Sequence, residues 1–302
     1  MMARARRPLA PKPAAMVAGR VLRRLLAVCL AALAAAPAHA EAPRRVVSIN
    51  VCTDQLAMLL AEPGQLVSVS HLATDPDVSA LAGQASAYQI NHGLAEEIFL
   101  LKPDLILAGT YTTPATVAML ERLGLRVEKF APEQSFADVR ANMLRMGSLL
   151  ETASRAEEMI AALDDDLEQL RRAQLPPLTV ATYASASYTT GRDSLADAVI
   201  QAAGLSNLGS ELGIQGGGHL PLEVLVLAGP EILANDTPVY KTPAMAQENL
   251  VHPAYRALRA RSAFAPIPTS AWVCGGPFTL VAANLLKNAA HTYLAGQAGR
   301  SR

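Results

Sequence analysis

The chain is poor in the residues that build metal centres and disulfide networks. Its 302 residues include six histidines, three cysteines and one tryptophan among only 13 aromatic residues. No His-x-x-x-His pair or other spacing of metal ligands occurs, which disfavours a site for bare zinc or manganese. The absence of a Gly-x-Ser-x-Gly motif disfavours a hydrolase with a nucleophile elbow. We therefore expect a protein that is not an enzyme, with a hydrolase or metal-dependent enzyme on an α/β scaffold as the alternative.

The first forty residues are predicted to be an export signal. A basic stretch precedes an apolar run that is too short for a permanent membrane anchor, and residues 38–40 form a small-x-small cleavage site before Glu41. If translation started at Met16, the leader would have an ordinary length. The sequence does not decide which methionine is the first residue. Val28 before Cys29 disfavours a lipoprotein, so a soluble exported product is expected, with an uncleaved anchor as the alternative.

Charge is distributed unevenly between this leader and the rest of the chain. The whole chain has 26 basic and 26 acidic residues, but residues 1–40 contain seven of the basic and none of the acidic ones. The remainder therefore has a net charge of −7. This negative charge disfavours nucleic acid or an anionic membrane surface as the partner. It is compatible with binding to a basic protein.

One helix-to-strand pattern occurs twice, from residue 93 and again from residue 220. In both copies a glutamate, Glu96 or Glu223, stands seven residues before a proline, and an apolar helical pattern fills the gap. The proline and a following acid then open a short aliphatic run. The repeat predicts two related lobes, each with a glutamate at the same place.

Strands and helices alternate along the chain. This alternation predicts an α/β fold of two Rossmann-like lobes with central, mostly parallel sheets, over residues 41–150 and 178–302. We expect residues 71–92 to be irregular, residues 216–218 to form a glycine loop and residues 267–273 to be the last strand.

Residues 151–177 are expected to join the lobes through a long rigid helix. Between Pro132 and Pro176 lie 43 residues with no proline and one glycine. Capping signatures that start at Ser135 and Ser154 divide this stretch into two helices. About 18 residues in the second make a rod of roughly 27 Å, which resists separation of the lobes.

Four parts of the chain together resemble a known family: residues 45–56, residues 93–106, the long central helices and residues 272–278. The family is the helical-backbone (class III) periplasmic binding proteins of ABC importers for vitamin B12, ferric siderophores and haem. The resemblance implies a monomeric periplasmic protein that captures an iron chelate or a cobalamin-type ligand between its lobes. It also implies delivery of that ligand to the membrane permease.

The resemblance further implies that one glutamate per lobe docks onto arginines of the permease. By their position in the repeat these are Glu96 and Glu223, with Glu97 as an alternative to Glu96. Two carboxylates held at a fixed separation suit charge-assisted, bidentate bonds to guanidinium groups. The alternative is that both are ordinary solvated helix residues.

Aromatic residues are the main candidates for ligand contact. Tyr88, Tyr188 and Trp272 resemble the aromatic residues of the family's cleft, and Tyr111 follows a predicted strand, where ligands of α/β proteins bind. Rings offer a large contact area with few rotatable bonds, which suits a bulky chelate. The alternative is that they are core or surface rings.

Two other residues are candidates for polar contacts with the ligand. His219 follows the glycine loop and is a candidate to approach a ligand or a haem iron. Arg192 is a candidate to pair with a carboxylate or phosphate, or else to cap the neighbouring helix. Siderophore, cobalamin and haem all remain open as ligands, although the single tryptophan puts cobalamin in doubt.

Cys52 and Cys274 remain once the leader is removed. An oxidising compartment permits a disulfide between them. Two separately buried thiols are equally consistent with the sequence, because a disulfide also requires short Cα–Cα distances.

Overall fold

A computed structural model describes residues 42–172, 174–235 and 244–300. The predicted export signal, including Met16 and Cys29, lies outside the described residues. Within the described ranges, none of the helices combines the length and the apolar composition that crossing a membrane requires.

The first half of the described chain is built on a five-stranded parallel sheet. Its strand order is β3-β2-β1-β4-β5. Strands β2 and β3 are therefore added on one side of β1, and β4 and β5 on the other side. Its central strands are aliphatic and buried, as expected for a parallel sheet covered on both faces. The bounds are β1 Val46–Ser48, β2 Leu66–Ser70, β3 Gln89–Asn91, β4 Leu105–Gly109 and β5 Val127–Phe130.

Two of the helices of this half, α2 and α6, begin at polar caps that the sequence provides. Asn50 accepts hydrogen bonds from the N–H groups of Cys52 (3.0 Å) and Thr53 (3.4 Å), and Ser135 accepts one from Asp138 N–H (3.2 Å). The predicted cap at Ser135 is thus confirmed. The helices are α2 Val51–Leu60, α3 Ala82–Ala85, α4 Ala95–Leu100, α5 Pro114–Arg122 and α6 Phe136–Leu150.

The second half contains a four-stranded parallel sheet and a small antiparallel pair. The parallel sheet has the order β11-β10-β6-β8, and β7 pairs with β9. The strands of this half are β6 Thr179–Thr182, β7 Tyr188–Thr190, β8 Ser206–Asn207, β9 Gly217–His219, β10 Ile232–Ala234 and β11 Ala263–Ala265. Its helices are α8 Leu195–Ala202, α9 Leu208–Glu211, α10 Leu222–Ala228, α11 Glu248–Val251 and α12 Pro253–Arg259.

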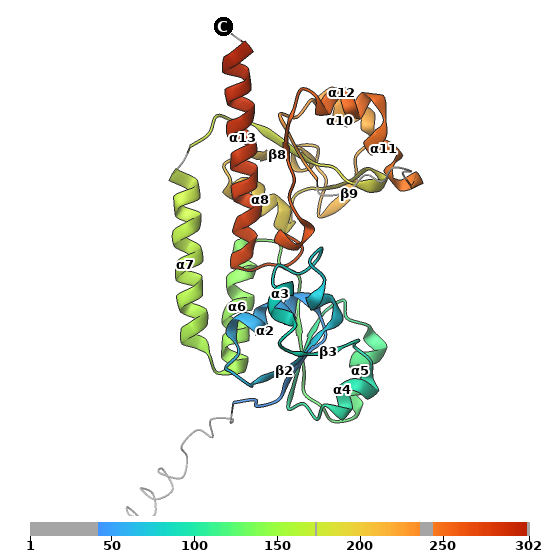
Figure 1. Cartoon of the computed structure of the whole chain (residues 1–302), viewed down its shortest axis with the longest axis vertical. Coiled ribbons are helices and arrows are strands. Elements are labelled where there is room, and N and C mark those ends of the chain that lie inside the picture. The colour runs from blue at the N-terminus through green and yellow to red at the C-terminus, as the bar shows by residue number, and fades with distance from the viewer. Residues whose placement is uncertain (1–41, 173, 236–243, 301–302) are drawn as a thin grey trace, which may run out of the picture. The chain divides into compact units, whose positions relative to one another are not determined.

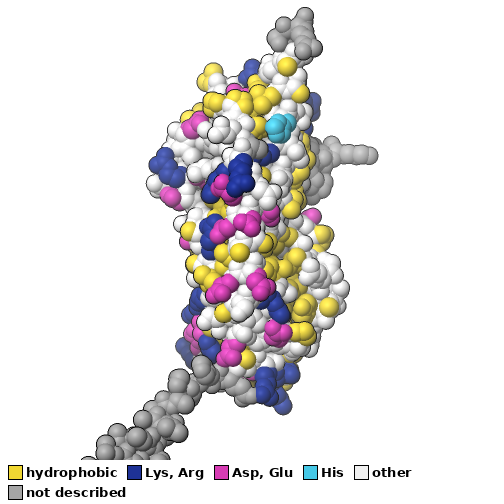
Figure 2. All heavy atoms as spheres, turned by 90° about the vertical axis from the view of Figure 1, so that its left-hand side faces the viewer, with side chains coloured by type: hydrophobic (Ala, Val, Ile, Leu, Met, Phe, Trp, Pro, Cys, Tyr) yellow, Lys and Arg dark blue, Asp and Glu magenta, His cyan; other side chains and the backbone are white. Residues whose placement is uncertain are grey.

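Two long helices, α7 Ala153–Arg172 and α13 Leu280–Arg300, pack against each other beside the sheets (Figure 1). One face of α7 is apolar and faces the core, since Ala156, Leu163, Leu167 and Leu170 are buried. Its opposite face carries charged side chains, and Figure 2 shows acidic groups along this side of the molecule. One hydrophobic cluster runs from α2 through α7 to α13, so the long helices share a core with both sheets.

Both ends of α7 are tied to neighbouring elements. The Arg155 guanidinium donates to the carbonyl oxygens of Leu60 (3.0 Å) and Ala61 (2.8 Å) at the end of α2. The Lys287 ammonium of α13 donates to the Leu170 carbonyl in the last turn of α7. These bonds satisfy carbonyls that a helix end leaves without intrahelical partners.

The structure corrects several sequence expectations. Residues 267–273 do not form the last strand; they contain the 3-10 helix Thr269–Ala271, while the last strand is β11. Pro266 and Pro268 lack the N–H groups that a continued strand would need. The stretch 71–92, expected to be irregular, contains β3, α3 and the 3-10 helix His71–Thr74. Residues 216–218, expected to be a loop, contain most of β9.

The second helix of the proline-free stretch also begins earlier than predicted. Because α7 starts at Ala153, Ser154 lies inside its first turn and is not the cap. The predicted fold class of two parallel-sheet lobes with a backbone helix is confirmed. The lobe boundaries at residues 150 and 178 stay a prediction.

A disulfide joins Cys52 and Cys274, whose Cα atoms lie 5.1 Å apart. Cys52 is in the first turn of α2, and Cys274 follows the 3-10 helix Thr269–Ala271. The bond therefore links the first sheet's α2 to the segment that leads into α13.

Asp54 is a buried carboxyl that should make stability depend on pH. Burial raises its pKa from 3.8 to about 6, although hydrogen bonds from Ser48 and Ser70 partly offset this effect. Because the pKa is higher in the folded than in the unfolded chain, folding favours the protonated form. The stability that protonation provides is complete below about pH 4 and is lost as the pH rises through about 6.

We expect Asp54→Asn to remove this pH dependence, because the amide oxygen still accepts from the Ser70 N–H and has no charge to bury. Between about pH 4 and pH 7, the free energy of unfolding of the original protein should fall by about 3 kcal/mol relative to that of the variant. Urea unfolding at a series of pH values measures the difference. Parallel pH curves for the two proteins would contradict the prediction.

Removal of the disulfide should destabilise the fold. The double variant Cys52→Ser with Cys274→Ser is expected to lose about 2–5 kcal/mol of unfolding free energy, because a long closed loop restricts the unfolded chain. Denaturant titration without reductant measures this loss. The original protein in reductant is the matched control and should unfold together with the variant; equal stability with and without the bond would disprove the effect.

Candidate functional site

A cavity of about 870 Å³ lies where β6 and β10 end, and the segment after β5 forms part of its wall. The first half of the chain contributes Asp77, Pro132 and Glu133, and the second half contributes Tyr188 and Trp272 among others. Ligands of α/β proteins bind outside the carboxyl ends of the strands, in pockets of roughly 300–1,000 Å³. Position and size therefore both identify this cavity as the candidate site.

Tyr188 is placed in the cavity wall by a tight turn and by a glycine. The 3-10 helix Ser185–Ser187 reverses the chain after β6, and the Thr190 N–H then donates to Thr182 Oγ1 (2.8 Å). A Cβ atom on Gly217 would lie 2.1 Å from the Tyr188 hydroxyl, so the tyrosine ring occupies the space that glycine leaves. The glycine thus makes room for Tyr188, whose side chain is 50% exposed.

Trp272 is held by the segment that carries the disulfide. It follows the 3-10 helix Thr269–Ala271 and packs, partly buried, against the main hydrophobic cluster. Two residues later Cys274 is bonded to Cys52. The ring therefore has a fixed position on the cavity wall.

Glu133 is a cavity residue that the sequence reasoning missed. Its side chain is largely buried, and its carboxyl oxygens accept from Gly275 N–H (3.1 Å) and Asn142 Nδ2 (2.6 Å). The Gly275 backbone approaches so closely that a Cβ there would lie 2.8 Å from Glu133 Cγ. Tyr111 was selected because ligands of α/β proteins bind where strands end, and it follows β4. The same reasoning would also have selected Glu133, which follows β5.

Tyr111 lies beside a smaller neighbouring cavity of about 50 Å³, which shares Pro132 and Glu133 with the large one. This cavity sits where β1 and β4 end, at the reversal of strand order in the first sheet. Asn50 also lines it, and its amide nitrogen is 2.8 Å from the position a Gly109 Cβ would take. The Tyr111 side chain itself is almost fully exposed.

Three other candidates do not line the large cavity. Tyr88 precedes β3 and packs, partly buried, against the main hydrophobic cluster. Arg192 is exposed and donates to the Ser210 carbonyl of α9 (3.3 Å), while Ser194 caps α8. His219 is exposed on β9, directly opposite Tyr188 in the antiparallel pair.

Glu96 and Glu223 occupy equivalent positions in the two halves. Each lies exposed in the first turn of its helix, α4 or α10. In the described part of the chain, neither carboxyl has a hydrogen bond or an ion pair. Glu97, by contrast, accepts from the His92 N–H (2.7 Å) and lies 3.4 Å from its ring nitrogen.

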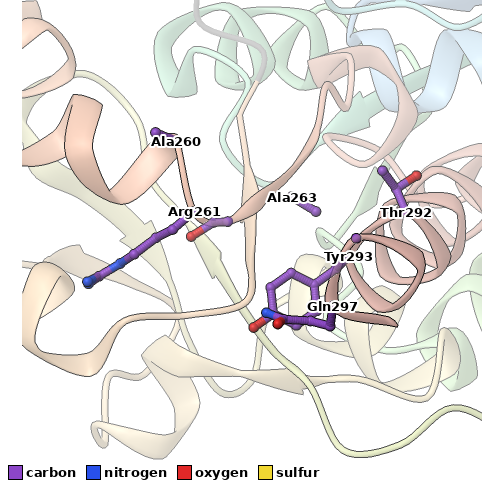
Figure 3. Close-up of a pocket in the computed structure, with 8 residues that line it drawn as sticks. Ala260, Arg261, Ala263, Thr292, Tyr293 and Gln297 are labelled. Atoms are coloured by element: carbon purple, nitrogen blue, oxygen red, sulfur yellow. The ribbon is translucent and has the colours of Figure 1, made fainter. Parts of the chain in front are cut away.

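A separate cavity of about 140 Å³ lies between the α12–β11 connection and α13. Figure 3 shows Tyr293 and Gln297 of α13 beside Ala263, with the Arg261 side chain extending away from them. The Arg261 guanidinium donates instead to the Val226 carbonyl (3.2 Å). This hollow is about a sixth of the volume of the large cavity, so it is a weaker candidate for a bulky ligand.

Residues 46–262 match the family model described as periplasmic binding protein. A search of curated protein sequences finds no significant match.

Three solved structures illustrate the likeness. The periplasmic heme-binding protein RhuT from Roseiflexus sp. RS-1 is 21% identical, with a TM-score of 0.65 over 82% of this chain and 99% of that one. The vitamin B12 binding protein BtuF of Vibrio cholerae is 18% identical, with a TM-score of 0.62 over 83% and 98%. An Fe3+-hydroxamate transport protein from Saccharomonospora viridis is 17% identical, with a TM-score of 0.62 over 82% and 93%.

Identities this low establish the fold alone, and the three names differ in their ligands. The family model, however, covers well over half of the chain. The resemblance inferred from the sequence is therefore confirmed, and the chain belongs to the periplasmic binding proteins of the helical-backbone type (class III).

Proposed function

We propose that the protein captures an iron chelate (siderophore) or a cobalamin-type ligand in the large cavity and delivers it to the permease of an ABC importer. The observation that carries this proposal is the cavity of about 870 Å³ with Trp272 and Tyr188 in its wall. Flat rings with polar edges suit the mixed apolar and polar surface of a chelate. The predicted leader in residues 1–40 supports a periplasmic location, where such a ligand is received.

The acidic side chains in the cavity wall favour a neutral or cationic ligand. Both Glu133, which is 7% exposed, and Asp77, which is exposed, line the cavity. A carboxylate near an apolar wall repels an anion more strongly than it would in water, because the local dielectric constant is lower. A ferric trihydroxamate or a corrinoid fits this lining better than haem, whose propionates are negatively charged.

Ligand binding should be visible through the only tryptophan of the chain. We expect a ferric trihydroxamate or cobalamin to quench Trp272 fluorescence saturably, because the ring lies in the cavity wall. Calorimetry should show that Trp272→Ala and Tyr188→Ala each weaken binding at least about tenfold, which corresponds to roughly 1.4 kcal/mol.

Conservative variants separate ring contact from damage to the fold. Tyr188→Phe and Trp272→Phe keep a ring and should retain most of the affinity, and all four variants should melt near the temperature of the original protein. If the alanine variants bind as tightly as the original protein, the large cavity is not the ligand site.

Docking onto the permease is proposed for Glu96 and Glu223. Their exposure and their lack of partners among the described residues leave both carboxylates available for guanidinium groups. Glu97 is already engaged with His92, which supports Glu96 as the docking residue of the first lobe. The fixed core around α7 supports a constant separation between the two carboxylates.

Charge reversal tests this docking. The chelate that quenches Trp272 fluorescence is used for uptake measurements in cells. The double variant Glu96→Lys with Glu223→Lys should abolish its uptake, because each lysine repels the arginines of the permease. The affinity of the double variant for that chelate should be unchanged. The matched control is Glu157→Lys with Glu211→Lys, which makes the same change in net charge at exposed positions of α7 and α9. Normal uptake by the first pair would refute the docking assignment.

A further inference from the structure

An exposed leucine follows each of the two glutamates by one helical turn. Leu100 is four residues after Glu96 in α4, and Leu227 is four residues after Glu223 in α10. Their side chains are 77% and 87% exposed, more than any other leucine in the described ranges. Residues four apart lie on the same helix face. Each half of the molecule therefore presents a carboxylate and an apolar side chain next to each other.

The fold itself does not require these two leucines. The core-facing positions of the same helices are occupied by Ile98 and Leu225, both fully buried and both two residues after the glutamate. A single exposed apolar side chain is ordinary on a protein surface. The same side chain at the same place in two repeated units, beside the same acidic residue, is a pattern that core packing does not explain.

In the first half the leucine also borders a hollow. An apolar groove of about 300 Å³ between α4 and α5 is lined by Phe99, Leu100, Met119 and Leu123, with Glu96 in the same lining. All four apolar side chains are exposed. The groove is large enough to receive an apolar side chain from another molecule, and the carboxylate at its edge favours a positive charge next to it.

We propose that Leu100, Leu227 and this groove form, together with Glu96 and Glu223, the surface that binds the permease. The proposal rests on the docking role proposed above and adds the chemistry of the partner. At each of the two contacts, the partner surface presents a guanidinium group beside apolar side chains. One of those side chains enters the groove between α4 and α5.

The physical reason lies in the weakness of exposed ion pairs. A carboxylate and a guanidinium in open water contribute about 0–1 kcal/mol and are screened by salt. Apolar contacts around the pair exclude water, strengthen the electrostatic attraction and add the free energy of apolar burial. With the glutamates alone, the affinity for the permease would be lost as the salt concentration rises. With leucines beside the glutamates, the affinity persists at moderate salt.

Photo-crosslinking in whole cells identifies what covers this surface. A benzoylphenylalanine residue replaces Leu100 or Leu227, and crosslinked proteins are identified by mass spectrometry. We expect the permease subunit of an ABC importer at both positions. The same probe at Leu144 and Leu212, two exposed leucines on other elements, is the matched control and should not reach the permease. Crosslinks from Leu100 and Leu227 to a second copy of this chain, to lipid or to nothing would overturn the proposal.

Titration of the identified permease in nanodiscs then separates the apolar contribution from the ionic one. Leu100→Ala with Leu227→Ala should weaken binding at least about tenfold at low and at high salt. Glu96→Gln with Glu223→Gln should weaken it mainly at low salt and flatten the salt dependence. Leu144→Ala with Leu212→Ala should bind like the original protein, and equal melting temperatures show that the folds are intact.

Failure of this inference can be told from failure of the proposed function. If the glutamine pair weakens binding and the alanine pair does not, docking stands and the role of the leucines is wrong. If neither pair changes the affinity for the permease, the docking surface lies elsewhere and both proposals fall.

Discussion

The attachment of residues 272–276 to the first sheet's elements is the constraint on which the ligand cavity depends. Cys274 is covalently bonded to Cys52 at the start of α2, and the Gly275 N–H donates to Glu133 after β5. Trp272 belongs to the same short segment, so its ring is positioned by bonds made to the other half of the chain. One wall of the cavity comes from each half, and this attachment joins the two walls directly, in addition to the hydrophobic core that both halves share.

The repeated helix-to-strand unit combines a core function with a surface function. In each copy the residue two after the glutamate is buried, while the glutamate and the residue four after it are exposed. The helix period of 3.6 residues explains this division, since positions two apart point to nearly opposite sides and positions four apart share one. The same local pattern thus fixes the helix on its sheet and presents a mixed acidic and apolar surface outward.

How well each element could be predicted depended on the strength of its local pattern. The alternation of strands and helices and the start of α6 at Ser135 were predicted, because burial and capping leave marks on adjacent residues. The three-residue strands β3 and β9 were missed, since so short a stretch shows no period and two residues of β9 are glycines without side chains. Residues 267–273 were wrongly predicted to be a strand, because Pro266 and Pro268 lack the N–H groups that a continued strand would need.

The two-lobed α/β class, the long backbone helix and the equivalent positions of Glu96 and Glu223 could be predicted from the sequence, because each leaves a pattern among residues that are close together in the chain. Which candidates share one cavity depends instead on the packing of the whole chain: Tyr188, Trp272 and Glu133 line the cavity, and Arg192 does not. Glu133 and Gly275 meet across 142 residues of sequence. Contacts over such distances are set by how whole helices and sheets pack, and no local pattern of residues encodes them.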